Sequence, residues 1–309
     1  MNRPSEQELK SFSAYYKQDT DFAAYARLLQ SKWRKGKGYP IGKSQNGTIY
    51  GNYVEEEFAR KRGCNFLTQK IWDIARKEME MAKTRGGLYQ EYRFICNLLT
   101  SQSMCFNLFG EFFEEKNTLL NIFNELKPGL MDKITEIRFE YPYRRADKKY
   151  LGDRTAFDVF IEYEKDGEKS FLGIEGKYAE ALREESMAQS EINYENHIQY
   201  KQITESCGLF KPEIINEIKK PPYSQMWRDH LLSISLKNSE SKYNNGYFVY
   251  LYPFNNLECR TGIKNYLLFL QDPEKSVFEI YVEDLIRAIQ KNVNKDWTNE
   301  LCDRYIKGL

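Results

Sequence analysis

The sequence is poor in the residues that most zinc sites and imidazole-based active sites use. Its 309 residues include only two histidines, His197 and His230, and none of its six cysteines stands in a CxxC pair. Structural zinc sites need four Cys or His ligands at short spacings, so the sequence argues against one. We therefore expect six reduced cysteines, and we expect any catalysis to depend on carboxylates, lysines and a hard metal ion.

Long apolar stretches are lacking as well. No segment approaches the roughly 18 consecutive apolar residues that span a bilayer. The first ten residues, MNRPSEQELK, do not contain the apolar core of a signal peptide. We expect a protein that has no membrane partner and works in the cytoplasm.

Positive charge, in contrast, is concentrated near the N-terminus. Residues 1–86 carry 17 Lys and Arg against 10 Asp and Glu, although the net charge of the whole chain is only +1. The densest cluster consists of Lys32, Arg34, Lys35 and Lys37. Basic side chains beside aromatic ones, such as Trp33 here, suit a phosphate backbone and stacked bases. These residues are candidates for nucleic-acid binding, and a solvated basic loop without a ligand explains the pattern equally well.

Hydrophobic periodicity divides the chain into two parts. Residues 1–86 show helical patterns around a Gly-rich segment at 36–51, which indicates a basic, mainly helical N-terminal module. Within 87–309, strands are expected at 134–141, 155–163, 171–178, 247–252 and 277–281, and helices at 88–99, 104–113, 117–126, 224–236, 257–270 and 282–293. The order α-β-β-β-α-β predicts an α/β fold with a mixed central sheet flanked by helices.

A short hairpin fixes the register of two of these strands. Asp166-Gly167, flanked by alternating residues, is a strong signal for a two-residue β-turn. In such a hairpin, each step forward along one strand faces one step back along the other, so the two residue numbers of every facing pair have the same sum. This register sets Asp158 opposite Glu175, with Lys177 on the same face. Alternation also places Phe157, Val159 and Ile161 on the opposite, apolar face.

Two facing carboxylates repel each other, and a divalent cation between them removes the conflict. Hard oxygen ligands favour Mg²⁺, for which Mn²⁺ can substitute, and the Gly176 carbonyl offers a further oxygen. Beside the ion, Lys177 could orient the attacking water or stabilise negative charge. Two carboxylates, a divalent ion and a lysine are together the groups that phosphodiester hydrolysis requires. Asp, Glu and Lys residues on a solvent-exposed strand face produce the same sequence pattern without forming a metal site, so this alternative explains the pattern too.

The Asp…Glu-x-Lys arrangement resembles the PD-(D/E)XK nuclease superfamily, with Phe157 in place of the usual Pro. More narrowly, the chain resembles a family of bacterial proteins that are classed as restriction endonucleases but are functionally uncharacterised. The stretches that carry this resemblance are 98–110, 137–141, 152–178, 225–232 and 250–253. The resemblance implies a restriction-endonuclease-like core, metal binding by Asp158 and Glu175, and a catalytic role for Lys177.

Four further residues are auxiliary candidates by this resemblance. Superfamily nucleases often add a glutamate from a helix before the sheet, for which Glu91 is the best placed, although a solvent-facing Glu explains it too. Glu140 sits between two aromatic residues on an expected strand. Gln225 and Arg228 share a helical face, where Arg228 could clamp a phosphate or pair with a nearby acid.

These features predict an Mg²⁺-dependent DNA endonuclease of restriction or phage-defence type, which could act as a homodimer. Two alternatives stay open at this point. One is a nucleic-acid-binding protein that kept the fold without catalysis, and the other is a repair nuclease acting on branched DNA or RNA.

Overall fold

The computed structural model describes residues 2–85, 89–144, 146–147, 149–180, 182 and 198–308. The expected junction at 86–87, the start of the helix expected at 88–99, and His197 lie outside the described residues. All six cysteines are free, as predicted. None of the described helices is long and apolar enough to cross a membrane.

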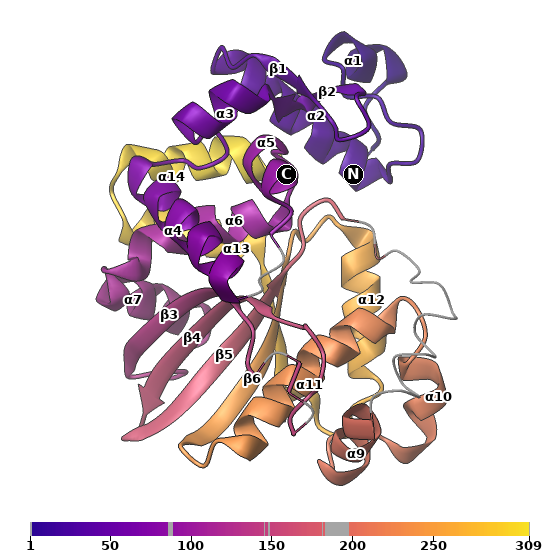
Figure 1. Ribbon diagram of the computed structural model, residues 1–309, viewed down its shortest axis with the longest axis vertical. Helices are drawn as coiled ribbons and strands as arrows, with labels where there is room; N and C mark the ends of the chain where they lie inside the picture. Colours follow the sequence, from indigo (N-terminus) through magenta and orange to yellow (C-terminus); the bar gives the residue numbers. More distant parts are fainter. Residues whose placement is uncertain are drawn as a thin grey trace.

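Five strands form one mixed sheet in the order β3-β4-β5-β6-β7 (Figure 1). The first three are antiparallel to one another, and β5, β6 and β7 run parallel. The strands are β3 (Lys133–Tyr141), β4 (Phe157–Lys165), β5 (Glu168–Gly176), β6 (Tyr243–Tyr252) and β7 (Val277–Tyr281). The predicted mixed sheet flanked by helices is confirmed.

The β4–β5 hairpin has the register that the sequence predicts. Pairing begins with Lys165 and Glu168 at the turn and continues to Val159 and Ile174. Asp166 and Gly167 both have positive φ angles, 51° and 78°, as a two-residue turn of this twist requires. The observed pairing ends one step before Asp158 and Glu175, which the same register would set opposite each other.

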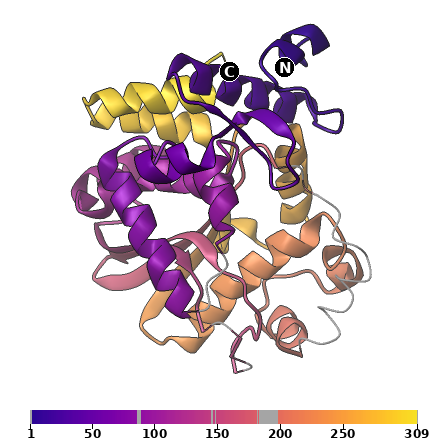
Figure 2. The same ribbon diagram turned by 45° about the horizontal axis from the view of Figure 1, so that its top comes forward.

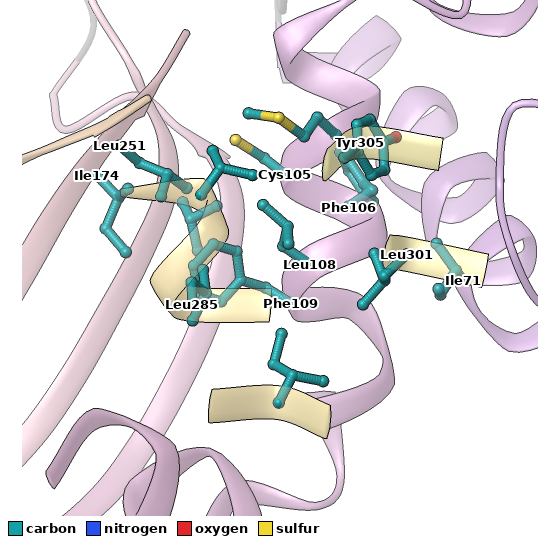
Figure 3. Close-up of a cluster of buried hydrophobic side chains, with 14 of the residues drawn as sticks. Ile71, Cys105, Phe106, Leu108, Phe109, Ile174, Leu251, Leu285, Leu301 and Tyr305 are labelled. Carbon is teal, nitrogen blue, oxygen red and sulfur yellow. The ribbon is translucent and has the colours of Figure 1, made fainter. Parts of the chain in front are cut away.

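Helices cover both faces of the sheet, and two hydrophobic clusters fill the space beneath them. On one face, Ile174 and Leu251 meet Phe106 and Phe109 of α6 and Leu285 of α13 (Figure 3). On the other face, Phe171 and Tyr250 pack with Trp227 of α11 and Ile263 of α12. The helices of the first face are α6 (Ser101–Phe109), η1 (Gly110–Phe113), α7 (Lys116–Leu126) and α13 (Val282–Asn292). Those of the second are α9 (Ile198–Ser206), η2 (Pro212–Ile214), α10 (Ile215–Ile218), α11 (Tyr223–Ser239) and α12 (Leu257–Leu267), with η3 (Pro273–Lys275) leading into β7.

The helix expected at 88–99 is much shorter in the structure. Its described part is α5 (Glu91–Cys96), which ends because the chain becomes extended at Asn97. Asn52 holds this turn through a 2.7 Å hydrogen bond to the side chain of Asn97. The two leucines that follow, Leu98 and Leu99, therefore pack in a turn that leads into α6.

The N-terminal module contains a small sheet in addition to helices. Its elements are α1 (Glu6–Ser11), α2 (Asp21–Gly36), β1 (Ile41–Lys43), β2 (Ile49–Val54), α3 (Glu56–Arg62) and α4 (Gln69–Arg85). The β1–β2 hairpin falls in the segment that was expected to be a loop, and it is too short to show an alternating pattern. Phe22 and Ala75 of the module share the hydrophobic cluster of Ile174 and Leu251. A division into domains at residue 86 stays a prediction.

The C-terminal elements α14 (Asp296–Leu301) and η4 (Cys302–Ile306), a π-helix, pack against α2 (Figure 2). Arg304 is fully buried and donates hydrogen bonds to the Gln30 side chain at 3.1 Å and to the Asn65 carbonyl at 2.8 Å. Gln30 donates in turn to the main-chain carbonyl of Arg304 at 2.6 Å and to the Tyr178 hydroxyl at 3.1 Å. The last helix thus joins the N-terminal module to the residue after Lys177.

Candidate active site

Asp158 lies in β4, one residue before the first residue that pairs with β5, Val159. Its Oδ2 accepts a hydrogen bond from the main-chain N–H of Gly176 at 2.8 Å and lies 4.0 Å from Sγ of Cys105 on α6. Burial and the negative charges of Glu175 and Glu140 raise the pKa of the Asp158 carboxyl well above its usual value. An ionised Asp158 is therefore costly unless a cation is bound nearby.

Glu175 and Lys177 are in direct contact and both are buried. Nζ of Lys177 donates to Oε1 of Glu175 at 2.6 Å, and Nε2 of Gln225 donates to the same oxygen at 2.9 Å. Burial alone lowers the pKa of Lys177, but the charges of Glu175, Glu180 and Asp158 outweigh it and raise that pKa. Lys177 is therefore an ammonium cation at neutral pH.

The alternation of side chains along β4 breaks at Asp158, which corrects one expectation. Phe157 does not lie on the face of Val159 but packs in the opposite cluster with Phe160 and Phe171. Its ring lies where a side chain at Gly173 would project, so that glycine makes room for it. At this point β4 leaves the β5 ladder but stays paired with β3 as far as Phe157, next to Glu140 of β3, whose φ of 47° departs from the regular strand.

Gly176 allows the close approach of α6 to the site. A Cβ atom at this position would stand 2.4 Å from Sγ of Cys105, which is far inside van der Waals contact. The glycine between Glu175 and Lys177 is thus a requirement of packing. The same close approach brings its N–H to Asp158.

A cavity of about 490 Å³ opens beside the carboxylates. Its lining includes Asp158, Glu175, Gln225 and Arg228, four of the residues that the sequence singled out. Six other residues complete the wall: Asp153, Arg154, Thr155, Ala156, Tyr200 and Asp229. Two segments that are remote in sequence, the end of the β3–β4 connection and one face of α11, therefore enclose the acids.

A family model described as the PD-(D/E)XK nuclease superfamily matches residues 17–307. The chain belongs to the PD-(D/E)XK nuclease superfamily. The match includes most of the N-terminal module, which the motifs alone left unexplained. Nucleases of this superfamily act on nucleic acid and generally use divalent metals. No curated protein and no solved structure matches the chain significantly.

The donor atoms at this superfamily site suit a hydrated divalent ion. Within the described part of the chain, no three side chains among His, Cys, Asp and Glu lie together as a complete metal site. Mg²⁺ characteristically binds one or two carboxylates and keeps several waters. Asp158 and Glu175 fit this pattern, and a cation would relieve the repulsion that raises the pKa of Asp158.

Asp229 is a site acid that the motif does not contain. It lies on α11 one turn after Gln225, is 4% exposed, and its Oδ2 has no hydrogen-bond partner among the described residues. Burial and the charge of Glu175 raise the pKa of this carboxyl. The spacing of four from Gln225 was the available signal, because residues four apart share a helical face.

The two auxiliary glutamates lie in different places. Glu140 accepts a hydrogen bond from Gln102, has a φ of 47°, and contributes to the raised pKa of Asp158. It also lines a second cavity of about 940 Å³ between α4 and β3. Glu91 instead forms ion pairs with Arg60 and with Lys83, the latter at 3.3 Å. The structure brings Glu140, but not Glu91, to the carboxylate pair.

The basic residues of the N-terminal module are largely engaged within the protein. Arg34 is buried and donates to the carbonyls of Gly51 and Tyr39. Nζ of Lys32 pairs with Glu8 at 2.7 Å, Lys37 pairs with Glu300, and Nζ of Lys35 lies 4.9 Å from the centre of the Phe12 ring. Their role in nucleic-acid binding stays a prediction.

Proposed function

We propose that the protein is an Mg²⁺-dependent endonuclease that hydrolyses phosphodiester bonds in DNA. The observation that carries the proposal is the contact of Lys177 and Gln225 with one oxygen of Glu175, beside the partly buried carboxylate of Asp158. A degenerate, purely binding member of the fold has no need to keep a lysine and two acids in one buried cluster. Mn²⁺ is expected to replace Mg²⁺.

Each residue has a separate task in this proposal. Asp158, Glu175 and the Gly176 carbonyl would hold the ion, which supplies charge neutralisation and an acidified water. Lys177, as an ammonium ion, stabilises the negative charge that grows on the phosphoryl oxygens as water attacks phosphorus and a P–O bond breaks. Gln225 keeps the Glu175 carboxylate in place, and Arg228 on the cavity wall is suited to bind an adjacent phosphate.

The test is cleavage of linear and circular DNA by purified protein with Mg²⁺, Mn²⁺ or chelator. Asp158→Ala and Lys177→Ala are expected to abolish cleavage, whereas Glu168→Ala, an exposed change at the other end of β5, should leave it intact. Equal cleavage by wild type and both site variants would exclude this site. Parallel reactions with RNA and with branched DNA test the repair alternative, which predicts that one of these substrates is cleaved in preference to linear duplex DNA.

We further propose a restriction or phage-defence role, which rests on the resemblance to proteins classed as restriction endonucleases. Such an enzyme meets its substrate in the cytoplasm, and cutting both strands calls for two sites, so a homodimer on DNA is expected. Cleavage of phage DNA but not of the producing cell's own DNA would support this role. Equal cleavage of both DNAs would count against it, and light scattering with DNA present would report the oligomeric state.

A further inference from the structure

We propose that the connection between β3 and β4 is a phosphate-binding surface that guides the DNA backbone to the carboxylate cavity. This inference rests on the proposed nuclease function and adds to it the surface that holds the substrate. The described residues that carry it are Arg144, Lys149 and Arg154; residues 145 and 148 have no part in the argument.

The connection ends at the candidate site itself. Asp153 and Arg154 line the same cavity as Asp158 and Glu175, only a few residues before the carboxylate on β4. Arg154 is exposed at the edge of this cavity. A DNA strand with its scissile phosphate at the acids therefore meets the end of this segment.

Contacts on both sides anchor the described residues of the connection. Tyr143 and Leu151 are buried in the cluster beneath α11, and the Tyr143 hydroxyl donates to Glu240 at 2.8 Å. The Ala146 N–H donates to the Asp153 carbonyl at 2.6 Å. Binding to anchored residues costs less conformational entropy than binding to free ones.

Positive charge on this loop is available to a ligand. Arg144 and Lys149 are exposed, and neither forms an ion pair with a carboxylate in the part of the chain that the structure describes. Both lie against one side chain, with 5.6 Å and 5.7 Å from their charged groups to the centre of the Tyr150 ring. That ring holds two cations near each other without neutralising them.

The acids of the loop are used for local structure. Oδ1 of Asp147 accepts the Lys149 N–H at 2.9 Å. The Asp153 carboxylate accepts the Thr155 N–H at 3.0 Å and the Tyr200 hydroxyl. The lysines of the N-terminal cluster differ from those of the loop, because Lys32 and Lys37 already have carboxylate partners. The loop, and not that cluster, therefore presents lysine and arginine charge without carboxylate partners, on the segment that leads to the site.

The experiment measures binding of fluorescently labelled duplex DNA by anisotropy, in chelator to prevent cleavage, as a function of salt concentration. The loop variant is Arg144→Gln with Lys149→Gln, and the matched control is Lys291→Gln with Lys295→Gln, two exposed lysines to which no binding role is assigned. Each lost phosphate contact reduces the slope of log K against log salt by about 0.9 on duplex DNA. We expect the magnitude of this slope to be smaller by roughly 1.8 in the loop variant, and its DNA affinity at moderate salt to be about tenfold lower. Its melting temperature should be unchanged.

An unchanged slope and affinity in the loop variant would overturn the proposal, whatever the control variant does. Cleavage by the wild type separates this failure from failure of the proposed function. If the wild type binds and cleaves DNA but the loop variant binds equally well, only the binding surface is wrong. If the wild type neither binds nor cleaves, both proposals fall.

Discussion

The main-chain N–H of Gly176 donates to Oδ2 of Asp158, so the strand that carries Glu175 also positions the carboxylate opposite to it. Asp158 has left the β4–β5 ladder at this point, and this hydrogen bond replaces the ladder as its restraint. The two acids are therefore held together by the protein before any ion binds, which is the arrangement that an efficient metal site requires.

Replacing Asp158 by Asn should abolish cleavage and yet stabilise the metal-free protein. The amide keeps an acceptor for the Gly176 N–H but removes a charge that burial and Glu175 disfavour. We expect a gain of about 1–2 kcal/mol, seen as a rise of a few degrees in melting temperature. Mg²⁺ should raise the melting temperature of the wild type but not of this variant. Equal stabilisation of both by Mg²⁺ would mean that Asp158 does not bind the ion.

Replacing Gln225 by Ala should weaken metal use without removing the chemistry. The side chain contacts Glu175 at 2.9 Å, and partners that orient a ligand typically contribute 10- to 100-fold in metal affinity. The Mg²⁺ concentration for half-maximal cleavage should rise by about tenfold or more, with most of the rate recovered at saturation. Gln290→Ala, on the exposed side of α13, is the control. A rate defect that saturating Mg²⁺ leaves untouched would contradict this positioning role.

His230 should make the fold sensitive to mild acid. Burial lowers the pKa of its imidazole to about 3, whereas an unfolded histidine titrates near 6.5. The unfolded state therefore binds more protons between these values, and stability is lost as pH falls through this window. The loss should be about 1 kcal/mol between pH 6 and pH 5. His230→Asn keeps a donor or acceptor for the Tyr266 hydroxyl and should flatten this pH dependence in urea titrations. An equally steep pH dependence in the variant would contradict the assignment.

Glu162 should stabilise the far end of the sheet in a lower pH range. Burial raises the pKa of this carboxyl, but hydrogen bonds from Lys169, Tyr243, Thr135 and Lys242 outweigh it and lower the pKa to about 2. A depressed carboxyl pKa contributes stability above the unfolded value of roughly 4.3, and this contribution disappears as pH falls towards 2. Glu162→Gln should cost about 1–3 kcal/mol at pH 7. The difference from wild type should shrink steadily below pH 4, and a difference that is constant with pH would refute the assignment.

The sequence was sufficient for those features that local rules determine. The Asp166-Gly167 turn fixes the register of its hairpin through backbone conformation alone, and this register holds as far as Val159 and Ile174, the neighbours of Asp158 and Glu175. The apolar run at 247–252 likewise required a strand covered on both faces. Such inferences depend on residues that are neighbours along the chain or across one turn.

Features that depend on tertiary packing were not accessible in this way. Asp229 and Arg154 reach the site only because α11 and the β3–β4 connection close over the same cavity. The reversed side of Phe157 follows from the end of a ladder whose length the sequence does not specify. The charge of Lys32 is cancelled by Glu8, a partner from another helix. In each case the deciding contact joins segments whose mutual placement no local pattern encodes.

The contact between Arg304 and Gln30 has a consequence for how the protein is made. The ribosome synthesises Gln30 274 residues before Arg304, and until then the Gln30 side-chain oxygen and the Asn65 carbonyl lack the guanidinium that donates to them. A growing chain can pair its strands, but it cannot complete the packing behind Lys177 before η4 has been made. That packing therefore forms only after all five strands of the sheet have been synthesised.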